Sequence, residues 1–323
     1  MHERFHASTL IFLLVLVLTS TPQSVRAQYI QVTQWGSHGT GNGQFDLPEG
    51  VVADGNGNVF VVDTYNDRIQ KFTSAGVYVS QWGSGGSGSG QFDYPKQAAV
   101  DGAGFVYVAD ANNHRIQKFT SGGTYLEQFG GHGSGNGQFQ APWGVAVNAS
   151  GEIYVGDSEN HRVQKLAANG DYITQWGSFG AGDGQFEYPN AAGVDASGNV
   201  YVADNINRRV EKFTSSGSYQ TQWGCPGRLY GMAVDAIGNV FVADPDNSQV
   251  EIYTNSGALQ SVLTGFQTPF NVAVDAGGSI YVADTYNYRI VKLVPAPTLT
   301  ARTTWGSVKA RYRPGAGATT QDK

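Results

Sequence analysis

The amino-acid sequence predicts an all-β protein, a six-bladed β-propeller of four-stranded antiparallel blades. The first observation is a repeat, because an apolar segment that ends in aspartate recurs six times, at Asp63, Asp110, Asp157, Asp204, Asp244 and Asp284. The second is its spacing of 47 residues between the first four copies and 40 residues thereafter, enough for four short strands with their turns. The third is the composition, since 44 glycines, 17 tyrosines and 16 phenylalanines in 323 residues are typical of strands joined by tight turns.

Each repeat unit contains four predicted strands. The first consists of small residues, as at 98–100 and 145–147, which suits an innermost position where six strands converge on the axis. The second ends in the repeated aspartate and is apolar at nearly every position, so both of its faces are expected to lie between neighbouring blades. The third begins with a residue such as Arg68, and the fourth ends in a pair such as Gln81 and Trp82.

The sixth unit lacks a fourth strand, because the chain meets Pro295 and Pro297 soon after Leu293. A segment of the missing type lies at the other end of the chain, where residues 29–35 match residues 77–82 in pattern. We therefore expect the N-terminal strand to complete the last blade. Such a closure ties the two ends of the propeller together and leaves no strand edge exposed.

The N-terminal segment has the layout of a secretory signal peptide, with Arg4 before an apolar run from Leu10 to Leu18 and Ala27 at the expected cleavage site. The predicted domains are a signal peptide over 1–27, the propeller over 28–294 and a basic tail over 295–323 that is flexible or forms a short helix. An uncleaved membrane anchor is the alternative for the first segment. After cleavage we expect a secreted protein, extracellular or periplasmic, with no membrane span.

The net charge limits the kinds of partner that the protein can bind, and the cysteine content excludes internal disulfides. The formal net charge is -6, and a mildly acidic chain lacks the basic footprint that nucleic acids and anionic membranes require. Cys225 is the only cysteine, so no internal disulfide can form and the core alone must hold the fold together. We expect a monomer that binds no nucleic acid.

The repeated motifs resemble those of a known family. A segment of the type Pro-x-Gly-Val-Ala-Val, one of the type Gly-Asn-Val-Tyr-Val-Ala-Asp and one of the type Asn-x-Arg-Ile-Gln-Lys-Phe follow one another in this order. Together they look like the NHL repeat, and the resemblance covers roughly residues 29–294 in six copies. The resemblance implies a six-bladed propeller in a family that includes extracellular sensor domains, modules that bind protein or RNA, and a few enzymes. A shared fold does not imply one activity.

The polar residues of the repeat are expected to be structural. Five of the six aspartates are followed five positions later by an arginine, the exception being Gln249 after Asp244, which predicts a charge-assisted pair across the turn. His114 and His161 occupy equivalent positions of adjacent blades, with Asp67 one blade earlier, and are the nearest approach to a metal site. We expect them to be turn residues, so the sequence predicts no metal, no cofactor and no catalytic residue.

The candidate binding residues vary from blade to blade. They lie where an inner strand begins or where the second strand turns into the third, and they are expected to surround one mouth of the central channel. They are Glu49, Lys96, Trp143, Asn190, Tyr230, Phe270, Tyr286 and Tyr288. Aromatic and polar side chains at a concave mouth are typical of a surface that binds a peptide or a glycan.

Loop lengths suggest where on this face a ligand lies. From the last residue of an outer strand to the start of the next inner strand there are 13 residues at the first four junctions and 6 at the last two. The longer, glycine-rich loops are expected to wall the face over the first four blades and leave it open over the fifth and sixth.

The sequence thus predicts a secreted, non-catalytic binding or scaffold propeller that recognises a protein, peptide or glycan. The alternative is a propeller enzyme, a lyase or hydrolase with a metal at the channel mouth.

Overall fold

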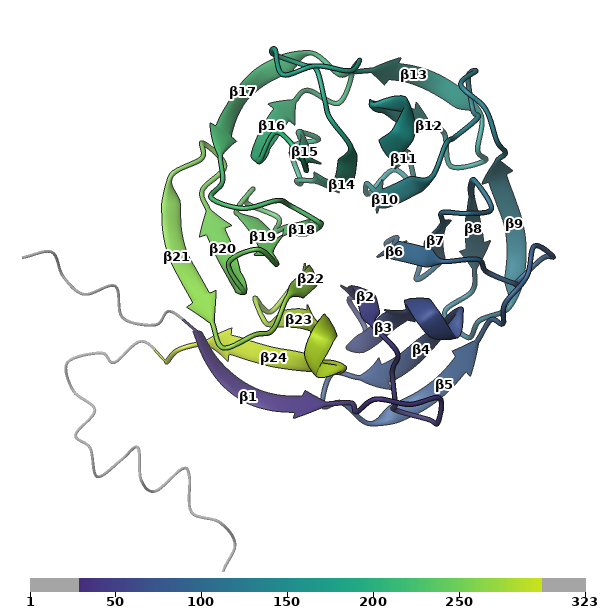
Figure 1. Cartoon of the computed structure of the whole chain (residues 1–323), viewed down its shortest axis with the longest axis vertical. Helices are drawn as coiled ribbons and strands as arrows, with labels where there is room; N and C mark the ends of the chain where they lie inside the picture. The colour runs from purple at the N-terminus through teal and green to yellow at the C-terminus, as the bar shows by residue number, and fades with distance from the viewer. Residues whose placement is uncertain (1–28, 298–323) are drawn as a thin grey trace, which may run out of the picture.

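Six four-stranded antiparallel sheets surround a central axis (Figure 1). The computed structural model describes residues 29–297. In five sheets the strands follow one another outward from the axis in chain order, and in the sixth the outermost strand is the N-terminal strand of the chain. The predicted six-bladed all-β propeller is therefore confirmed. The predicted signal peptide and nearly all of the predicted tail lie outside the described residues.

The blades are numbered one to six along the chain, and each contributes one strand to each ring of the disc. The inner strands are β2 (Pro48–Ala53), β6 (Pro95–Val100), β10 (Pro142–Val147), β14 (Pro189–Val194), β18 (Gly231–Val234) and β22 (Pro269–Val274). The second strands are β3 (Asn58–Asp63), β7 (Val106–Asp110), β11 (Ile153–Asp157), β15 (Val200–Asp204), β19 (Val240–Asp244) and β23 (Ile280–Asp284). The third strands are β4 (Arg68–Thr73), β8 (Arg115–Phe119), β12 (Arg162–Leu166), β16 (Arg209–Phe213), β20 (Gln249–Tyr253) and β24 (Arg289–Pro295). The outer strands are β5 (Tyr78–Trp82), β9 (Tyr125–Gly130), β13 (Tyr172–Trp176), β17 (Tyr219–Gly224), β21 (Leu259–Thr264) and, for blade six, β1 (Tyr29–Trp35).

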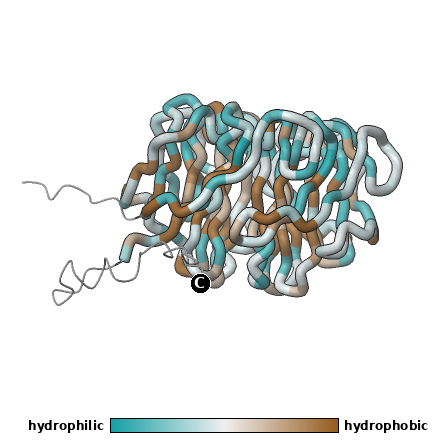
Figure 2. The backbone as a smooth tube through the Cα atoms, turned by 90° about the horizontal axis from the view of Figure 1, so that it is seen from below, coloured by the Kyte–Doolittle hydropathy of each residue, from teal (hydrophilic) through white to brown (hydrophobic). Residues whose placement is uncertain are grey.

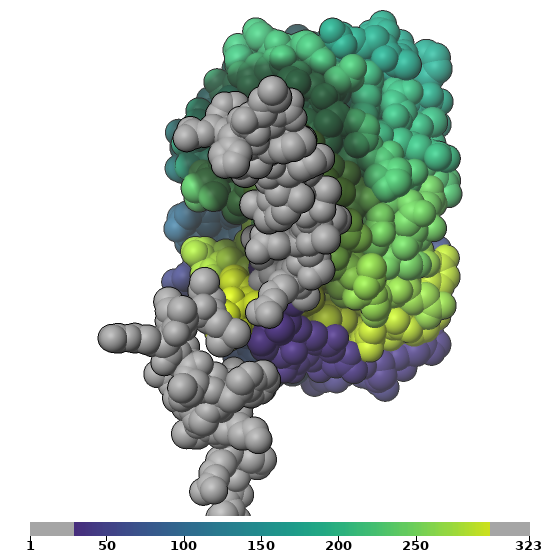
Figure 3. Space-filling view, turned by 90° about the vertical axis from the view of Figure 1, so that its left-hand side faces the viewer, coloured from purple at the N-terminus to yellow at the C-terminus, as the bar shows by residue number. Residues whose placement is uncertain are grey.

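The N-terminal strand closes the ring, as predicted. β1 pairs antiparallel with β24, with Tyr29 opposite Pro295 and Trp35 opposite Ile290. Figure 3 shows the N-terminal strand, in purple, against the yellow C-terminal strands at one edge of the disc. The indole of Trp35 also lies 5.8 Å from the ring of Phe72 in blade one, so β1 joins the last blade to the first.

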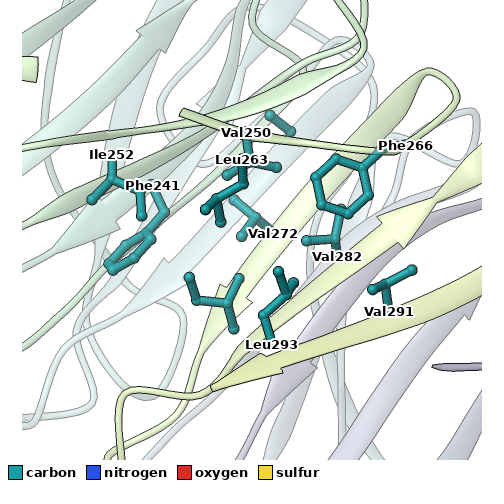
Figure 4. Close-up of a cluster of buried hydrophobic side chains, with 11 residues drawn as sticks. Phe241, Val250, Ile252, Leu263, Phe266, Val272, Val282, Val291 and Leu293 are labelled. Atoms are coloured by element: carbon teal, nitrogen blue, oxygen red, sulfur yellow. The ribbon is translucent and has the colours of Figure 1, made fainter. Parts of the chain in front are cut away.

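The core lies between the blades, in a middle layer of the disc. All residues of the second strands β7, β11, β15, β19 and β23 are buried, which confirms the prediction that these strands are covered on both faces. Figure 2 shows the hydrophobic residues concentrated between the two faces. Figure 4 shows one such cluster, in which Phe241 and Leu263 of blade five face Val282 and Leu293 of blade six.

The repeated aspartate and arginine form the predicted pair in five blades. The distance from the arginine Nε to the aspartate Oδ2 is 2.7 Å for Arg68 and Asp63, and 2.6 to 2.8 Å in blades two, three, four and six. In blade five the amide of Gln249 lies 3.4 Å from Asp244 instead. Each of these aspartates is fully buried, so its carboxylate requires a compensating positive charge, and the arginine supplies that charge.

The arginines also hold the glycine-rich loops in place. Arg115 donates to the carbonyl oxygens of Ser87, Gly88 and Gln91 at 2.8 to 2.9 Å. The amide N–H of Gly90 in the same loop donates to Gln117 Oε1. Each loop is thus tied to the third strand of the blade that follows it.

Among residues 29–297 there is no helix long and apolar enough to cross a membrane.

Candidate binding site at the channel mouth

Two sets of connections open onto one face of the disc, which we call the mouth face. They are the loops that lead into each inner strand and the turns between second and third strands, which in three blades are the 3-10 helices η1 (Thr64–Asn66), η2 (Ser158–Asn160) and η3 (Thr285–Asn287). The opposite face carries the hairpin turns between inner and second strands, such as residues 54–57. The first residues of every inner strand therefore face the mouth side of the channel.

A buried ion pair joins blades one and two at this face. Lys96 Nζ donates to Glu49 Oε2 at 2.5 Å, and the same ammonium lies 3.6 Å from the ring centre of Tyr94 and 4.3 Å from that of Trp143. Both partners are buried, with 3% of Lys96 and 8% of Glu49 exposed. Burial lowers the pKa of Lys96 and raises the pKa of Glu49, while the contact between them opposes both shifts. The structure thus places these two candidate residues in a contact between blades, where they also line a small cleft with Trp143, Tyr230 and Phe270.

A second contact crosses the channel beside this pair. Gln97 Nε2 of blade two donates to the carbonyl oxygen of Tyr230 in blade five at 2.9 Å. Beyond it the axial channel contains a cavity of about 160 Å³, lined by inner-strand residues such as Ala99, Ala146 and Ala273. These small side chains fit the predicted innermost position.

The candidate aromatic residues form a continuous row along the mouth. The rings of Trp143 and Tyr230 are 5.7 Å apart, those of Tyr230 and Phe270 are 4.8 Å apart, and those of Phe270 and Tyr286 are 6.3 Å apart. Aromatic pairs at such distances stabilise one another and present rigid apolar faces. Tyr288 is not part of this row, and its ring centre lies 4.6 Å from that of His38.

A pocket of about 230 Å³ opens on the mouth face beside this row, between blades three, four and five. We call it the mouth pocket. It is lined by Trp143, Glu159, Tyr188, Asn190, Asn205, Ile206, Arg228 and Tyr230. The pocket lies partly over blades three and four, which the loop lengths predict to be walled.

The charged residues of the mouth pocket are held in place by neighbours. Arg228 contacts Asp246 with two nitrogens, Nε at 3.2 Å and Nη2 at 3.0 Å. Glu159 Oε2 accepts a hydrogen bond from Gln140 Nε2 at 2.9 Å. These contacts restrict both side chains, so that a guanidinium and a carboxylate are presented to the same cavity.

Asn190 lies deeper in the mouth pocket. It is the second residue of β14, only 3% of it is exposed, and its Oδ1 has no hydrogen-bond partner within residues 29–297. A buried amide oxygen without a partner is unfavourable, because it has given up its hydrogen bonds to water. A ligand that brings a hydrogen-bond donor to this oxygen would replace a hydrogen bond that the oxygen has lost.

Asp67, His114 and His161, the three residues considered for a metal site, share one structural role. Each has a left-handed backbone, with φ between 49° and 55°, at the end of a turn between second and third strands. Each side chain accepts the N–H of the residue 27 positions later, at 3.0 Å for Asp67, 3.1 Å for His114 and 3.3 Å for His161. Within residues 29–297 no group of three or more His, Cys, Asp or Glu side chains is arranged to hold a metal ion.

Sequence reasoning did not include Tyr188 and Arg228 among the candidate residues. Both occupy the position just before the first residue predicted for an inner strand, where Tyr94 stands in blade two. Tyr188 and Tyr94 both have a left-handed backbone, with φ of 59° and 58°. Their variation among blades resembles that of the candidate positions, so the same comparison of repeats could have found them.

The fold and its ring closure define a β-propeller, and comparisons with known proteins agree. The NHL repeat family matches residues 45–72, 92–119, 139–166 and 266–293, which belong to blades one, two, three and six. The chain therefore contains NHL repeats in these four blades. Blades four and five lie outside the matched residues but pair their second and third strands in the same register, with Asp204 opposite Arg209 and Asp244 opposite Gln249.

Several solved structures are similar in fold. A streptogramin B lyase is 12% identical, with a TM-score of 0.60, over 85% of this chain and 100% of that chain. A gluconolactonase from Xanthomonas campestris is 16% identical, with a TM-score of 0.63, over 79% of this chain and 88% of the other. A chain of a nidogen/laminin complex is 13% identical, with a TM-score of 0.57, over 70% of this chain and 83% of that chain. No curated protein sequence matches the chain. At such identities the similarity establishes the fold alone.

Proposed function

We propose that this protein is a non-catalytic binding propeller that recognises a protein, peptide or glycan through its mouth face. The observation that carries the proposal is the row of aromatic rings from Trp143 to Tyr286 beside a pocket with restrained polar groups. Aromatic residues offer large contact areas with little side-chain entropy to lose on binding, and they often dominate affinity. The predicted signal peptide supports a role outside the cytoplasm.

The chemistry of the mouth pocket favours binding over catalysis. Its lining contains one carboxylate, that of Glu159, and no histidine, cysteine or serine. General acid–base catalysis by side chains usually pairs two titratable groups with separated pKa values, and covalent catalysis needs an activated nucleophile. The lining residues provide neither arrangement.

Arrays of peptides and glycans test this proposal. The parent protein should bind at least one class of probe, and Tyr230→Ala and Phe270→Ala should each weaken that binding by about 2 kcal/mol, roughly thirtyfold. The matched control is Ile237→Ala, because Ile237 is 75% exposed on the opposite face. If both mouth variants fold and bind as well as the parent while Ile237→Ala loses binding, the site lies on the other face.

The alternative, a propeller enzyme with a metal at the channel mouth, has a separate test. Metal analysis of the purified protein should find no tightly held ion in stoichiometric amount. One zinc or calcium per chain that is lost on replacing His114 or His161 would favour the lyase or hydrolase instead.

A further inference from the structure

The mouth pocket combines features that identify a ligand more narrowly than the proposed function does. We infer that it binds one ring of a neutral, hydroxyl-rich saccharide. This inference rests on the proposed function, because it specifies the ligand of the same face. It is carried by three observations, namely the aromatic walls, the balance of charge and the unpartnered amide of Asn190.

The walls are aromatic on three sides, each from a different blade junction. Trp143 is the second residue of the inner strand of blade three, Tyr188 precedes the inner strand of blade four, and Tyr230 precedes that of blade five. Tyr188 is 42% exposed, whereas Trp143 and Tyr230 are half-buried and packed against each other. A sugar ring has faces made of C–H groups, and a flat aromatic side chain covers such a face without requiring the hydroxyl groups to lose their hydrogen bonds.

The polar groups of the mouth pocket include both a donor and an acceptor. Arg228 uses Nε and Nη2 on Asp246, so its Nη1 has no partner among the described residues. Glu159 uses Oε2 on Gln140, and its Oε1 has no hydrogen bond within the described part of the chain. A guanidinium and a carboxylate therefore present free hydrogen-bonding groups of opposite kind to one cavity.

This combination favours a neutral ligand. An anionic group that only accepts hydrogen bonds would be repelled by Glu159, and a cationic group that only donates them would be repelled by Arg228. A hydroxyl group donates and accepts, so neighbouring hydroxyls on one ring can satisfy Glu159, Arg228 and Asn190 together. An extended peptide also has both kinds of group, but it spreads them along a strand and requires a groove or a free strand edge rather than a compact pocket.

Asn190 supplies the most specific constraint. Its side chain is 97% buried, lines the mouth pocket and leaves Oδ1 without a partner among residues 29–297. The other blades place Glu49, Lys96, Trp143, Tyr230 or Phe270 at this position. A site that hydrogen-bonds a ligand hydroxyl through a buried amide discriminates strongly against ligands that lack that hydroxyl.

The test uses saturation-transfer NMR and titration with methyl glycosides of glucose, galactose, mannose and N-acetylglucosamine. Probes of other chemistry are inorganic phosphate, a short arginine peptide and its citrulline analogue. At least one glycoside should bind, with transfer to its ring C–H protons, and its affinity should stay constant between about 50 mM and about 500 mM salt. Tyr188→Ala and Asn190→Ala should each weaken that binding at least about tenfold. Tyr65→Ala is the control, because Tyr65 is a 50% exposed tyrosine on the same face, outside the mouth pocket.

The remaining outcomes separate this inference from the proposed function. Binding of peptide or phosphate that is lost in Tyr188→Ala, with no glycoside bound at about 10 mM, overturns the saccharide and leaves a binding role for the face. Glycoside binding that Tyr188→Ala and Asn190→Ala leave unchanged overturns the placement in the mouth pocket. If no array probe binds in a way that mouth-face substitutions alter, the proposed function and this inference both fail. A thermal melt of each variant shows whether it has kept its fold.

Discussion

Lys96 of blade two donates a hydrogen bond to Glu49 of blade one, and this buried pair joins the two blades at the mouth face although the residues lie 47 positions apart in the chain. Each residue is the second of its inner strand. The contact therefore depends on two blades standing side by side around the axis. Buried pairs of this kind are costly to break, because removing one partner leaves the other charge without compensation.

Replacing Lys96 alone should be strongly destabilising. Lys96→Met keeps the length of the side chain but leaves Glu49 buried and unpaired, so we expect a loss of about 3 to 5 kcal/mol in the free energy of unfolding. Denaturant unfolding gives the value. The double variant with Glu49→Gln should recover part of the loss. The control is Lys118→Met, whose partner Glu127 is 42% exposed and whose loss should stay near 1 kcal/mol or below. Equal losses in Lys96→Met and the double variant would contradict the assigned pairing.

Glu211 of blade four predicts a pH dependence. The first three blades carry a glutamine at this position, and the amides of Gln70, Gln117 and Gln164 donate to the repeated aspartate at 3.0 to 3.1 Å. In blade four two fully buried carboxylates, Asp204 and Glu211, share Arg209. Burial raises the pKa of Glu211 to about 7, against a usual value of 4.5.

The sign of this effect follows from proton linkage. Between pH 4.5 and about 7 the folded protein holds a proton on Glu211 that the unfolded chain has released, so stability falls as the pH rises through this window. Glu211→Gln removes the dependence and should exceed the parent by about 3 kcal/mol at pH 8, while the two are similar near pH 4.5. Melting curves across this range provide the measurement. Parallel pH profiles for parent and variant would show that Glu211 titrates normally.

The loop-holding arginines should differ in importance between blades. Arg115 makes five hydrogen bonds to side chains and loop carbonyls, whereas Arg289 makes three and is more exposed. Lysine has a single ammonium and cannot reproduce the fork of a guanidinium. We expect Arg115→Lys to cost about 2 to 4 kcal/mol and Arg289→Lys about half as much.

Hydrogen exchange gives a local measurement of the same effect. In Arg115→Lys the amides of residues 83–91 should exchange faster, because the carbonyl oxygens of that loop have lost the hydrogen bonds that the guanidinium donates to them. The corresponding junction before blade six should change little in Arg289→Lys. A larger loss in Arg289→Lys than in Arg115→Lys would refute the role assigned to the glycine-rich loops.

The closing strand should be essential for stability. Deleting residues 29–35 exposes the edge of β24 and removes the contact of Trp35 with Phe72, so we expect a loss above about 4 kcal/mol and a tendency to aggregate. Thermal melting and size-exclusion chromatography report both effects. Val32→Thr, at a half-exposed position of the same strand, should change the stability by less than about 0.5 kcal/mol. An unchanged melting temperature after the deletion would show that β1 does not close the ring.

The sequence by itself was sufficient for the architecture. The spacing of the repeated aspartates predicted six blades, the missing fourth strand of the last unit predicted closure by β1, and the five-residue offset predicted the Asp–Arg pairs. These features are local or repeat six times, so each copy supports the assignment of the others. Loop lengths were a weaker guide, since the mouth pocket lies partly over blades that carry the longer loops.

Only the tertiary structure decided which side chains meet at the mouth. Glu49 and Lys96 occupy positions of the repeat equivalent to those of Trp143 and Tyr230, yet the first two form a buried ion pair and only the last two line the mouth pocket. Tyr288 was predicted to belong with Tyr286, but its ring lies beside that of His38. The physical reason is that these residues meet across blades, where equivalent positions of the repeat carry side chains of different charge and size. Their contacts are set by how the closed ring brings six inner strands to one axis and by how side chains of unequal size fill the space there.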